Sequence, residues 1–322
     1  MRIFHGINNA SIARGTVLTF GVFDGLHLGH QKIMQVVVER AREIKAIATV
    51  ITFDPHPRAV LYPKSAPALL QTLDQRLAAF EVLGIQQAIV INFDKEFASM
   101  RAEEFIKNII HGRLQAREVY LGKGFAFGKN REGNIELLKK MSQELGFFAD
   151  EVPEVSLRGQ RISSSKIREL LLLGKVNLAR RMLGRPYGIE GQVIQGDGRG
   201  RMLGFPTANL LTKNRVIPKN GVYVTASLIE GKWLRSITNV GFRPTFHNSE
   251  DSPSIETHIF GFKDNLYGNV LRIRFLHRIR NEKKFSNIEE LKSQIIKDIN
   301  RAKKYFNRQG VKNSLKLVQN YD

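Results

Sequence analysis

The chain has 322 residues, of which 42% are hydrophobic and 25% charged, and it contains no cysteine. At roughly 150 residues per domain this length suggests about two domains, and the composition is that of a globular protein with real cores. The absence of cysteine excludes disulfides and cysteine-based zinc sites.

The formal net charge of +20 favours polyanionic ligands such as nucleotides or RNA. A lysine-rich solvated surface without a specific partner would give the same net charge. Residues 1–14 lack the apolar core of a signal peptide, and no stretch approaches the ~18 apolar residues needed to cross a bilayer. These features predict a cytoplasmic protein without a membrane partner.

The first half of the chain alternates short apolar runs with amphipathic stretches. The strand-like runs are residues 17–23, 46–53, 88–93 and 118–121. The helical patterns between and after them are residues 31–43, 74–83, 102–110 and 135–145. This alternation predicts a Rossmann-like α/β domain whose parallel sheet is covered on both faces and binds ligands where strands end.

Near residue 184 the sequence changes from helical patterns to short β-rich runs. A helix over residues 162–174, capped by Ser163 or Ser164, and a second helical pattern to residue 183 precede a break at residues 184–188. The later runs are short, β-rich and separated by turn residues: 221–228, 233–240, 254–260 and 270–275. They predict an antiparallel barrel or sandwich, followed by a C-terminal helix that begins at a capping box of Ser286 and Glu289.

The strongest local signal joins the first predicted strand to the first helix, over residues 21–30. Gly29 allows a phosphate to approach the backbone, and the helix N-terminus offers unpaired N–H groups to an anion. His27 and His30 flank that point and can donate hydrogen bonds to charge that develops on a phosphate. Gly21, Phe23 and Asp24 complete this candidate nucleotide-binding turn.

The His-x-Gly-His pattern resembles the nucleotidyltransferase superfamily, which transfers a nucleotidyl group from ATP or CTP to a phosphate. The superfamily's second signature, Ile-Ser-Ser-Thr-x-x-Arg, is matched by residues 162–168 with serine at position 165. Ser164 and Ser165 then cap a helix on which Lys166 and Arg168 face the β- and γ-phosphates.

The more specific resemblance is to the bacterial bifunctional riboflavin kinase/FMN adenylyltransferases, from about residue 15 to about residue 305. It is carried by residues 52–57, 97–98, 104–105, 125–129 and 183–187. It implies an adenylyltransferase domain over residues 1–184, a β-barrel riboflavin kinase domain over 185–308, and a basic tail over 309–322.

The second domain carries a glycine-rich loop over residues 196–204. Its amides can cradle phosphates with arginine nearby, and we place Gly198, Arg201, Gly204 and Pro206 in that site. The following Pro-Thr-Ala-Asn run is the riboflavin kinase signature. By that resemblance Thr207 and Asn209 hold Mg²⁺ and nucleotide oxygens.

Residues 241–246 and 255–258 continue the kinase pattern. The family's catalytic base falls on Glu256, a carboxylate within an otherwise apolar run, and Arg280 lies where the family closes on flavin. No Gly-x-x-x-x-Gly-Lys-Ser/Thr motif occurs, which excludes a P-loop kinase.

The resemblance implies FAD biosynthesis at two separate ATP sites, with riboflavin, FMN and ATP as substrates and Mg²⁺ as cofactor. In the first domain His27 and His30 stabilise the α-phosphate of ATP while Arg168 holds the departing pyrophosphate. In the second domain Glu256 activates the 5′-hydroxyl of riboflavin. The expected state is a monomer or a weak homo-oligomer.

Three positions depart from the family pattern: Val22 stands in place of Asn, Gly124 in place of Asp or Asn, and Ala126 in place of Arg. They leave open a riboflavin kinase whose adenylyltransferase domain is weakened. Two further interpretations are a nucleotidyltransferase for a different acceptor and, given the basic residues 301–316, an RNA-binding protein on this scaffold. The Pro-Thr-Ala-Asn run opposes the former, and the lack of an aromatic-interleaved RNA motif opposes the latter.

Overall fold

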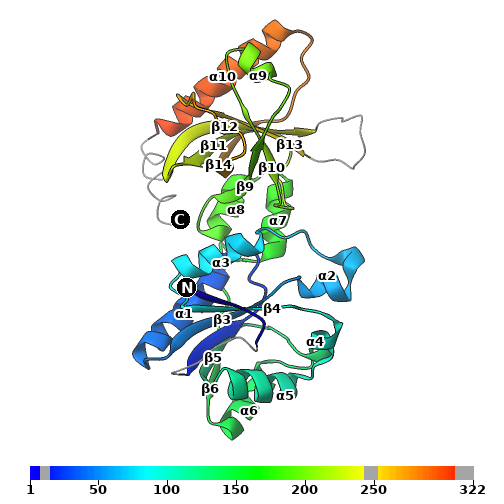
Figure 1. Ribbon diagram of the computed structural model, residues 1–322, viewed down its shortest axis with the longest axis vertical. Coiled ribbons are helices and arrows are strands. Elements are labelled where there is room, and N and C mark those ends of the chain that lie inside the picture. Colours follow the sequence, from blue (N-terminus) through cyan, green and yellow to red (C-terminus); the bar gives the residue numbers. More distant parts are fainter. Residues whose placement is uncertain (8–14, 243–252, 309–322) are drawn as a thin grey trace. The chain divides into compact units, whose positions relative to one another are not determined.

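The computed structural model describes residues 1–7, 15–242 and 253–308. Two compact units divide the chain, Met1–Ser164 and Ser165–Asp322 (Figure 1). The predicted tail over 309–322 and the predicted kinase-motif residues 243–246 lie outside the described residues. None of the helices in the described part of the chain combines the length and apolar character needed to cross a membrane.

The first unit is built on a six-stranded parallel sheet with the order β1-β4-β3-β2-β5-β6. Its strands are β1 (Arg2–His5), β2 (Thr16–Phe20), β3 (Ile47–Phe53), β4 (Gln87–Ile91), β5 (Ala116–Gly122) and β6 (Phe148–Val152). The parallel sheet predicted from the sequence is therefore confirmed. Because the chain runs from β2 to one side and returns to add β5 on the other, the strand order reverses beside β2, where such sheets bind ligands.

Helices cover both faces of this sheet. The helical segments of the unit are α1 (Leu28–Glu43), α2 (Pro57–Leu61), η2 (Pro63–Ser65), α3 (Leu73–Val82), α4 (Lys95–Ser99), α5 (Ala102–Glu104), the π-helix η3 (Phe105–Arg113), η4 (Lys129–Arg131) and α6 (Ile135–Leu145). Buried residues of α1 and α3, including Met34 and Phe80, join one core cluster. Residues of η3 and α6, including Ile106 and Leu138, form the other. A two-stranded sheet of β7 (Ser156–Leu157) and β8 (Gln160–Arg161) follows.

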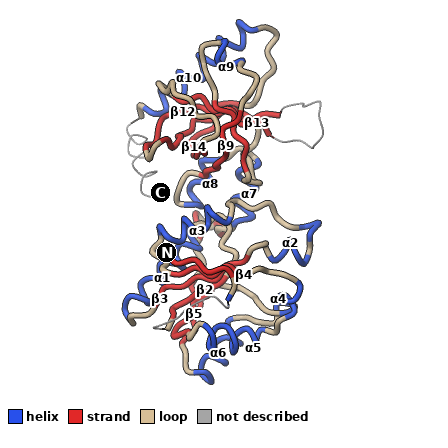
Figure 2. The backbone as a smooth tube through the Cα atoms, viewed as in Figure 1, coloured by secondary structure: helices blue, strands red, loops and turns tan. Residues whose placement is uncertain are grey.

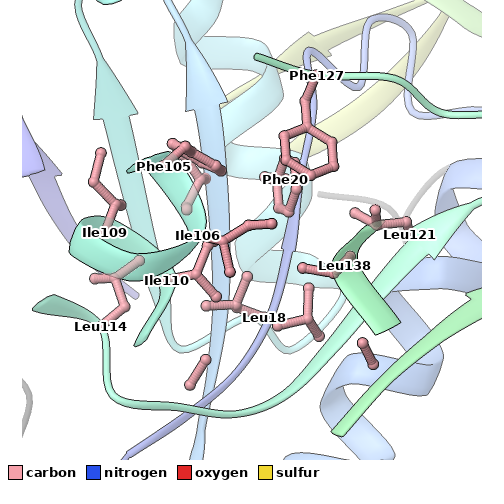
Figure 3. Packing of buried hydrophobic residues seen from close by; sticks show 14 of the residues in the cluster. Leu18, Phe20, Phe105, Ile106, Ile109, Ile110, Leu114, Leu121, Phe127 and Leu138 are labelled. Carbon is pink, nitrogen blue, oxygen red and sulfur yellow. The ribbon is translucent and has the colours of Figure 1, made fainter. Parts of the chain in front are cut away.

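Aromatic rings occupy the part of this core cluster that lies at the carboxyl end of β2. Figure 3 shows Phe20, Phe105 and Phe127 grouped above the aliphatic side chains of Leu18 and Leu138. The ring of Phe20 meets those of Phe105 and Phe127 edge-on, with centroids 5.2 Å and 5.1 Å away. Such edge-to-face pairs hold rings at defined angles, so this end of the core has a fixed shape.

The second unit is a closed antiparallel barrel, which confirms the predicted barrel (Figure 2). Its strand order is β10-β13-β12-β11-β14-β9, so each of these six strands pairs with a neighbour on both sides. The strands are β9 (Tyr187–Ile194), β10 (Ala208–Thr212), β11 (Gly221–Ile229), β12 (Lys232–Phe242), β13 (Pro253–Ile259) and β14 (Val270–Arg280). The helices are α7 (Ser164–Leu172), α8 (Val176–Leu183), α9 (Arg199–Met202) and α10 (Ile288–Phe306).

Helix α10 packs on the outside of β11, β12 and β14 through Ile299, Ala302 and Phe306. The capping box predicted at Ser286 and Glu289 is wrong by one residue. Asn287 is the N-cap, and its side chain accepts a hydrogen bond from the Glu290 N–H at 2.8 Å. Serine and asparagine are both good N-caps, so composition alone could not decide between neighbouring positions.

Candidate functional site

The turn between β2 and α1 has an unusual backbone. Phe23, Gly25 and Leu26 all have positive φ angles, at 52°, 79° and 39°. A non-glycine residue in this region costs on the order of 1–3 kcal/mol and is retained mainly where a functional site requires that shape. The turn is therefore strained at Phe23, which was predicted to bind a nucleotide, and at Leu26, next to the predicted His27.

The two predicted histidines lie against one another at the start of α1. His27 is the N-cap, and its Nδ1 accepts a hydrogen bond from the His30 N–H at 3.3 Å. The two rings stack with centroids 3.6 Å apart. A Cβ on Gly29 would lie 3.2 Å from the His27 ring, so glycine leaves room for this arrangement. Both imidazoles thus gather with the N-terminal N–H groups of a 16-residue helix, a general anion-binding arrangement.

Asp24 and Ser164 hold this turn in place. The Asp24 carboxylate is only 3% exposed and accepts hydrogen bonds from the backbone N–H groups of Leu70 and Gln71, at 2.9 and 3.2 Å. Ser164 Oγ donates to the Asp24 carbonyl at 2.8 Å. A serine of the second predicted motif therefore contacts the first motif directly.

The remaining residues of the second motif continue along α7. Ser165 is exposed, Lys166 Nζ lies 2.8 Å from the Glu169 carboxylate, and Arg168 is half-buried. The helix itself confirms the predicted one and ends at Leu172.

Sequence reasoning missed Arg76, which lies in α3 and has no exposed surface. Its Nη1 donates to the Val22 carbonyl at 2.7 Å and to Thr52 Oγ1 at 3.1 Å, and its Nη2 donates to the Phe53 carbonyl at 3.3 Å. Burial lowers the pKa of this guanidinium, and the carboxylates of Asp24 and Asp54 act in the opposite direction. A single arginine in a helical pattern does not indicate which distant residues it contacts, so its hydrogen bonds to Val22 and Phe53 could not be predicted.

A cavity of about 430 Å³ opens beside the same turn. Its walls include Gly21 and Val22 from the turn, and Ala126 and Asn130 from the segment after β5. Eight aromatic side chains also line it: Phe20, Phe53, Tyr62, Phe93, Phe97, Phe105, Phe125 and Phe127. These rings come from segments far apart in the sequence, so no local pattern could have revealed the cavity. Its size and apolar character suit a flat aromatic ligand.

In the second unit the glycine loop lies directly on the predicted threonine and asparagine. A side chain at Gly196 would overlap the Asn209 amide, and a Cβ at Gly200 would lie 3.1 Å from Thr207 Oγ1. Gly198 and Gly204 have positive φ angles of 72° and 87°. The close approach explains the glycines, because any other residue would push the loop away from these two polar side chains.

Strand register brings Glu256 into line with two amide side chains. Glu256 pairs with Asn209 across β10 and β13, and with Asn239 across β12 and β13. Partners in an antiparallel register project to the same face, so the three polar side chains form a row. Glu256 is half-buried, and its Oε1 accepts a hydrogen bond from Ser254 Oγ at 3.2 Å.

A second cavity, of about 480 Å³, lies beside the neighbouring residues Thr207, Ala208 and Thr257 of the same segments. Arg201, Pro206 and Thr207 line it, and the Pro206 carbonyl lies 2.8 Å from His258 Nδ1. Arg280, predicted to bind flavin, pairs with Asp298 at 2.7 Å and lies over the Phe285 ring at 5.8 Å. Its guanidinium is therefore already engaged by α10 and by the preceding loop.

The parallel sheet with its histidine-flanked turn and the barrel with its glycine loop define a two-part protein with one candidate phosphate site in each part. The family model described as FAD synthetase matches residues 9–166, and the one described as riboflavin kinase matches residues 183–306. The chain belongs to the bifunctional riboflavin kinase/FMN adenylyltransferase family.

Curated relatives with that description span nearly the whole chain. The protein from Haemophilus influenzae is 38% identical over 95% of this chain and 100% of its own length. The protein from Escherichia coli (strain K12) is 35% identical over 95% and 98%. The Bacillus subtilis protein is 38% identical over 90% and 92%. A crystal structure from Streptococcus pneumoniae, described as a macrolide-efflux protein, matches with a TM-score of 0.86 at 29% identity over 94% of this chain and 99% of its own.

Proposed function

We propose that this chain makes FAD from riboflavin in two ATP-dependent steps. Its second unit phosphorylates riboflavin to FMN, and its first unit adenylylates FMN with release of pyrophosphate. The observation that carries the proposal is that each unit has its own phosphate-type turn beside its own cavity: the histidine turn with the aromatic cavity, and the glycine loop with the cavity at Thr207.

In the kinase site Glu256 is the general base. It takes the proton from the ribityl 5′-hydroxyl as that oxygen attacks the γ-phosphorus of ATP, a role typically worth ~10²–10⁴ in rate. The glycine loop, with Gly198, Arg201, Gly204 and Pro206, positions the nucleotide. Catalysis otherwise consists of positioning and neutralisation of phosphate charge.

Thr207 and Asn209 are proposed to hold Mg²⁺ together with oxygens of the nucleotide. No cluster of three or more His, Asp or Glu side chains in the described ranges is arranged to hold a metal ion. Hydroxyl and amide oxygens that approach a substrate phosphate suit Mg²⁺, which prefers oxygen ligands and commonly shares them with substrate. When bound, the ion supplies positive charge to the phosphates.

In the adenylyltransferase site the FMN phosphate attacks the α-phosphorus of ATP. His27, His30 and the N-terminus of α1 stabilise the negative charge on that phosphate, while Arg168, by the resemblance, holds the departing pyrophosphate. We place the flavin ring in the aromatic cavity, because Gly21 and Val22 belong both to its wall and to the turn. The FMN phosphate can then reach the histidines.

Chemical analysis of one incubation tests the whole proposal. Purified protein supplied with riboflavin, ATP and Mg²⁺ should form FMN first and then FAD, as resolved by chromatography. FMN that accumulates without FAD would support a kinase with a weakened adenylyltransferase site. No flavin product, together with RNA binding that weakens steeply with salt, would support an RNA-binding protein.

The cytoplasmic location and the monomeric or weakly oligomeric state remain predictions.

Two crossed substitutions test the division of labour. Glu256→Ala should reduce FMN formation by about 10²-fold or more and leave FMN-to-FAD conversion unchanged. His30→Ala should reduce FAD formation from supplied FMN by about 10²-fold and leave riboflavin phosphorylation unchanged. In each variant, the activity that is retained shows that the unit without the substitution is still folded. Loss of both activities in either variant would contradict the two-site assignment.

A further inference from the structure

Five hydroxyl side chains form a continuous hydrogen-bonded chain inside the barrel. Oxygen–oxygen distances along it are 2.9 Å (Ser227–Ser236), 2.8 Å (Ser236–Thr225), 2.8 Å (Thr225–Thr238) and 2.9 Å (Thr238–Thr257). All five residues are at most 1% exposed. A run of hydroxyls in a barrel core is unusual, because aliphatic side chains would fill the space without polar groups to satisfy.

The number of hydroxyl protons determines in which direction the hydrogen bonds run along these five side chains. Five hydroxyls carry five protons, and the four bonds use four of them. At one end, Ser227 donates to Ser236. If Ser236 donates onward to Thr225, Thr225 to Thr238 and Thr238 to Thr257, every proton inside the barrel has an acceptor. Any reversed bond would leave a buried hydroxyl proton without one, which is unfavourable.

In this arrangement the fifth proton belongs to Thr257. It is not donated to any of the other four hydroxyls, so it can be donated to another acceptor. Thr257 lines the cavity that also contains Thr207 and Arg201. It pairs in register with Ala208, and Val193 and Ile259 line the same cavity. Thr257 is thus the member of the hydroxyl chain that borders this ligand-sized space.

We propose that the Thr257 hydroxyl donates a hydrogen bond to an acceptor atom on the adenosine part of the nucleotide in this cavity, and that the Thr238 hydroxyl, 2.9 Å away, orients it. The apolar neighbours Val193 and Ile259 favour a base or sugar over a phosphate at this point. Thr257 follows Glu256 on β13, and successive residues of a strand face opposite sides. Thr257 therefore acts on the nucleotide and not on the general base. This inference rests on the proposed kinase function.

The test is Thr257→Val, which removes the hydroxyl and keeps the side-chain shape. We expect the KM for ATP in riboflavin phosphorylation to rise roughly three- to tenfold, the effect of one lost neutral hydrogen bond, with a smaller change in kcat. ATP binding measured by calorimetry should weaken by the same factor. Thr257→Ser keeps the hydroxyl and should restore the wild-type KM, and Thr257→Ala replaces the valine variant should that one not fold.

Ser227→Ala is the matched control. It removes a buried hydroxyl at the opposite end of the same hydroxyl chain, so it should lower thermal stability but leave the KM for ATP unchanged. An unchanged KM in Thr257→Val, with wild-type protein forming FMN normally, would overturn this inference alone. Wild-type protein that forms no FMN would overturn the proposed function instead.

Discussion

Arg76 illustrates how much of the first site depends on a single buried cation. An arginine stays protonated in proteins, so burying it is costly unless its hydrogen bonds are made. The carbonyls of Val22, just beyond β2, and of Phe53, at the end of β3, accept hydrogen bonds from its two terminal nitrogens. We therefore interpret Arg76 as a positioning residue that sets where the histidine turn leaves the sheet.

Arg76→Gln should destabilise the first unit by about 3 kcal/mol or more, because it leaves strand-end acceptors without their partner. FMN adenylylation should fall at least tenfold, while riboflavin phosphorylation stays unchanged. Arg76→Lys keeps the charge but not the planar fork, so we expect an intermediate loss. Urea unfolding and separate assays of the two reactions measure these effects. Wild-type adenylylation in the glutamine variant would show that the turn keeps its shape without Arg76.

At the scale of elements, the residue that caps the start of α10 differs between the sequence-based prediction, Ser286, and the structure, Asn287. Asn287→Ala should cost about 1 kcal/mol of the unfolding free energy, the usual value of a lost N-cap. Ser286→Ala should be nearly neutral, because its backbone N–H, which donates to the Glu290 carboxylate, is retained. Chemical denaturation of both variants measures the difference. Equal losses, or a larger loss at Ser286, would contradict Asn287 as the cap.

Further elements show where local pattern is sufficient. Strands β3, β4 and β11 are apolar runs bounded by turn residues, and the predicted ranges agree with them to within about two residues. The short strand β10 was not predicted, since a five-residue segment beside a glycine loop carries little periodic signal. Yet β10 places Asn209 opposite Glu256.

At the scale of the whole molecule, α7 and α8 raise the question of where the first unit ends. The predicted boundary follows residue 184, whereas the first compact unit ends at Ser164. Within the second unit, the Leu171 carbonyl accepts the Lys219 N–H at 3.0 Å, and the Asn177 amide lies 3.1 Å from His277 Nδ1. These helices therefore pack on the barrel.

A fragment of residues 165–322 should accordingly be more stable than one of residues 185–322. We expect its midpoint of thermal unfolding to be higher by at least about 4 °C, since a loss of even 1 kcal/mol shifts a unit of this size by several degrees. Circular dichroism on the two fragments measures the difference, and riboflavin phosphorylation reports whether the barrel is intact. Equal midpoints would favour the boundary at residue 184.

Sequence alone determined the parallel sheet, the barrel, and the two glycine-containing turns where phosphate is expected, because periodicity, caps and glycine spacing are local properties of the chain. Only the tertiary structure decided which side chains surround those turns. The aromatic cavity, the contacts of Arg76 and the row of Asn209, Glu256 and Asn239 join residues from different strands and loops. Such contacts depend on strand order and register, which result from packing the whole unit and which no short segment encodes.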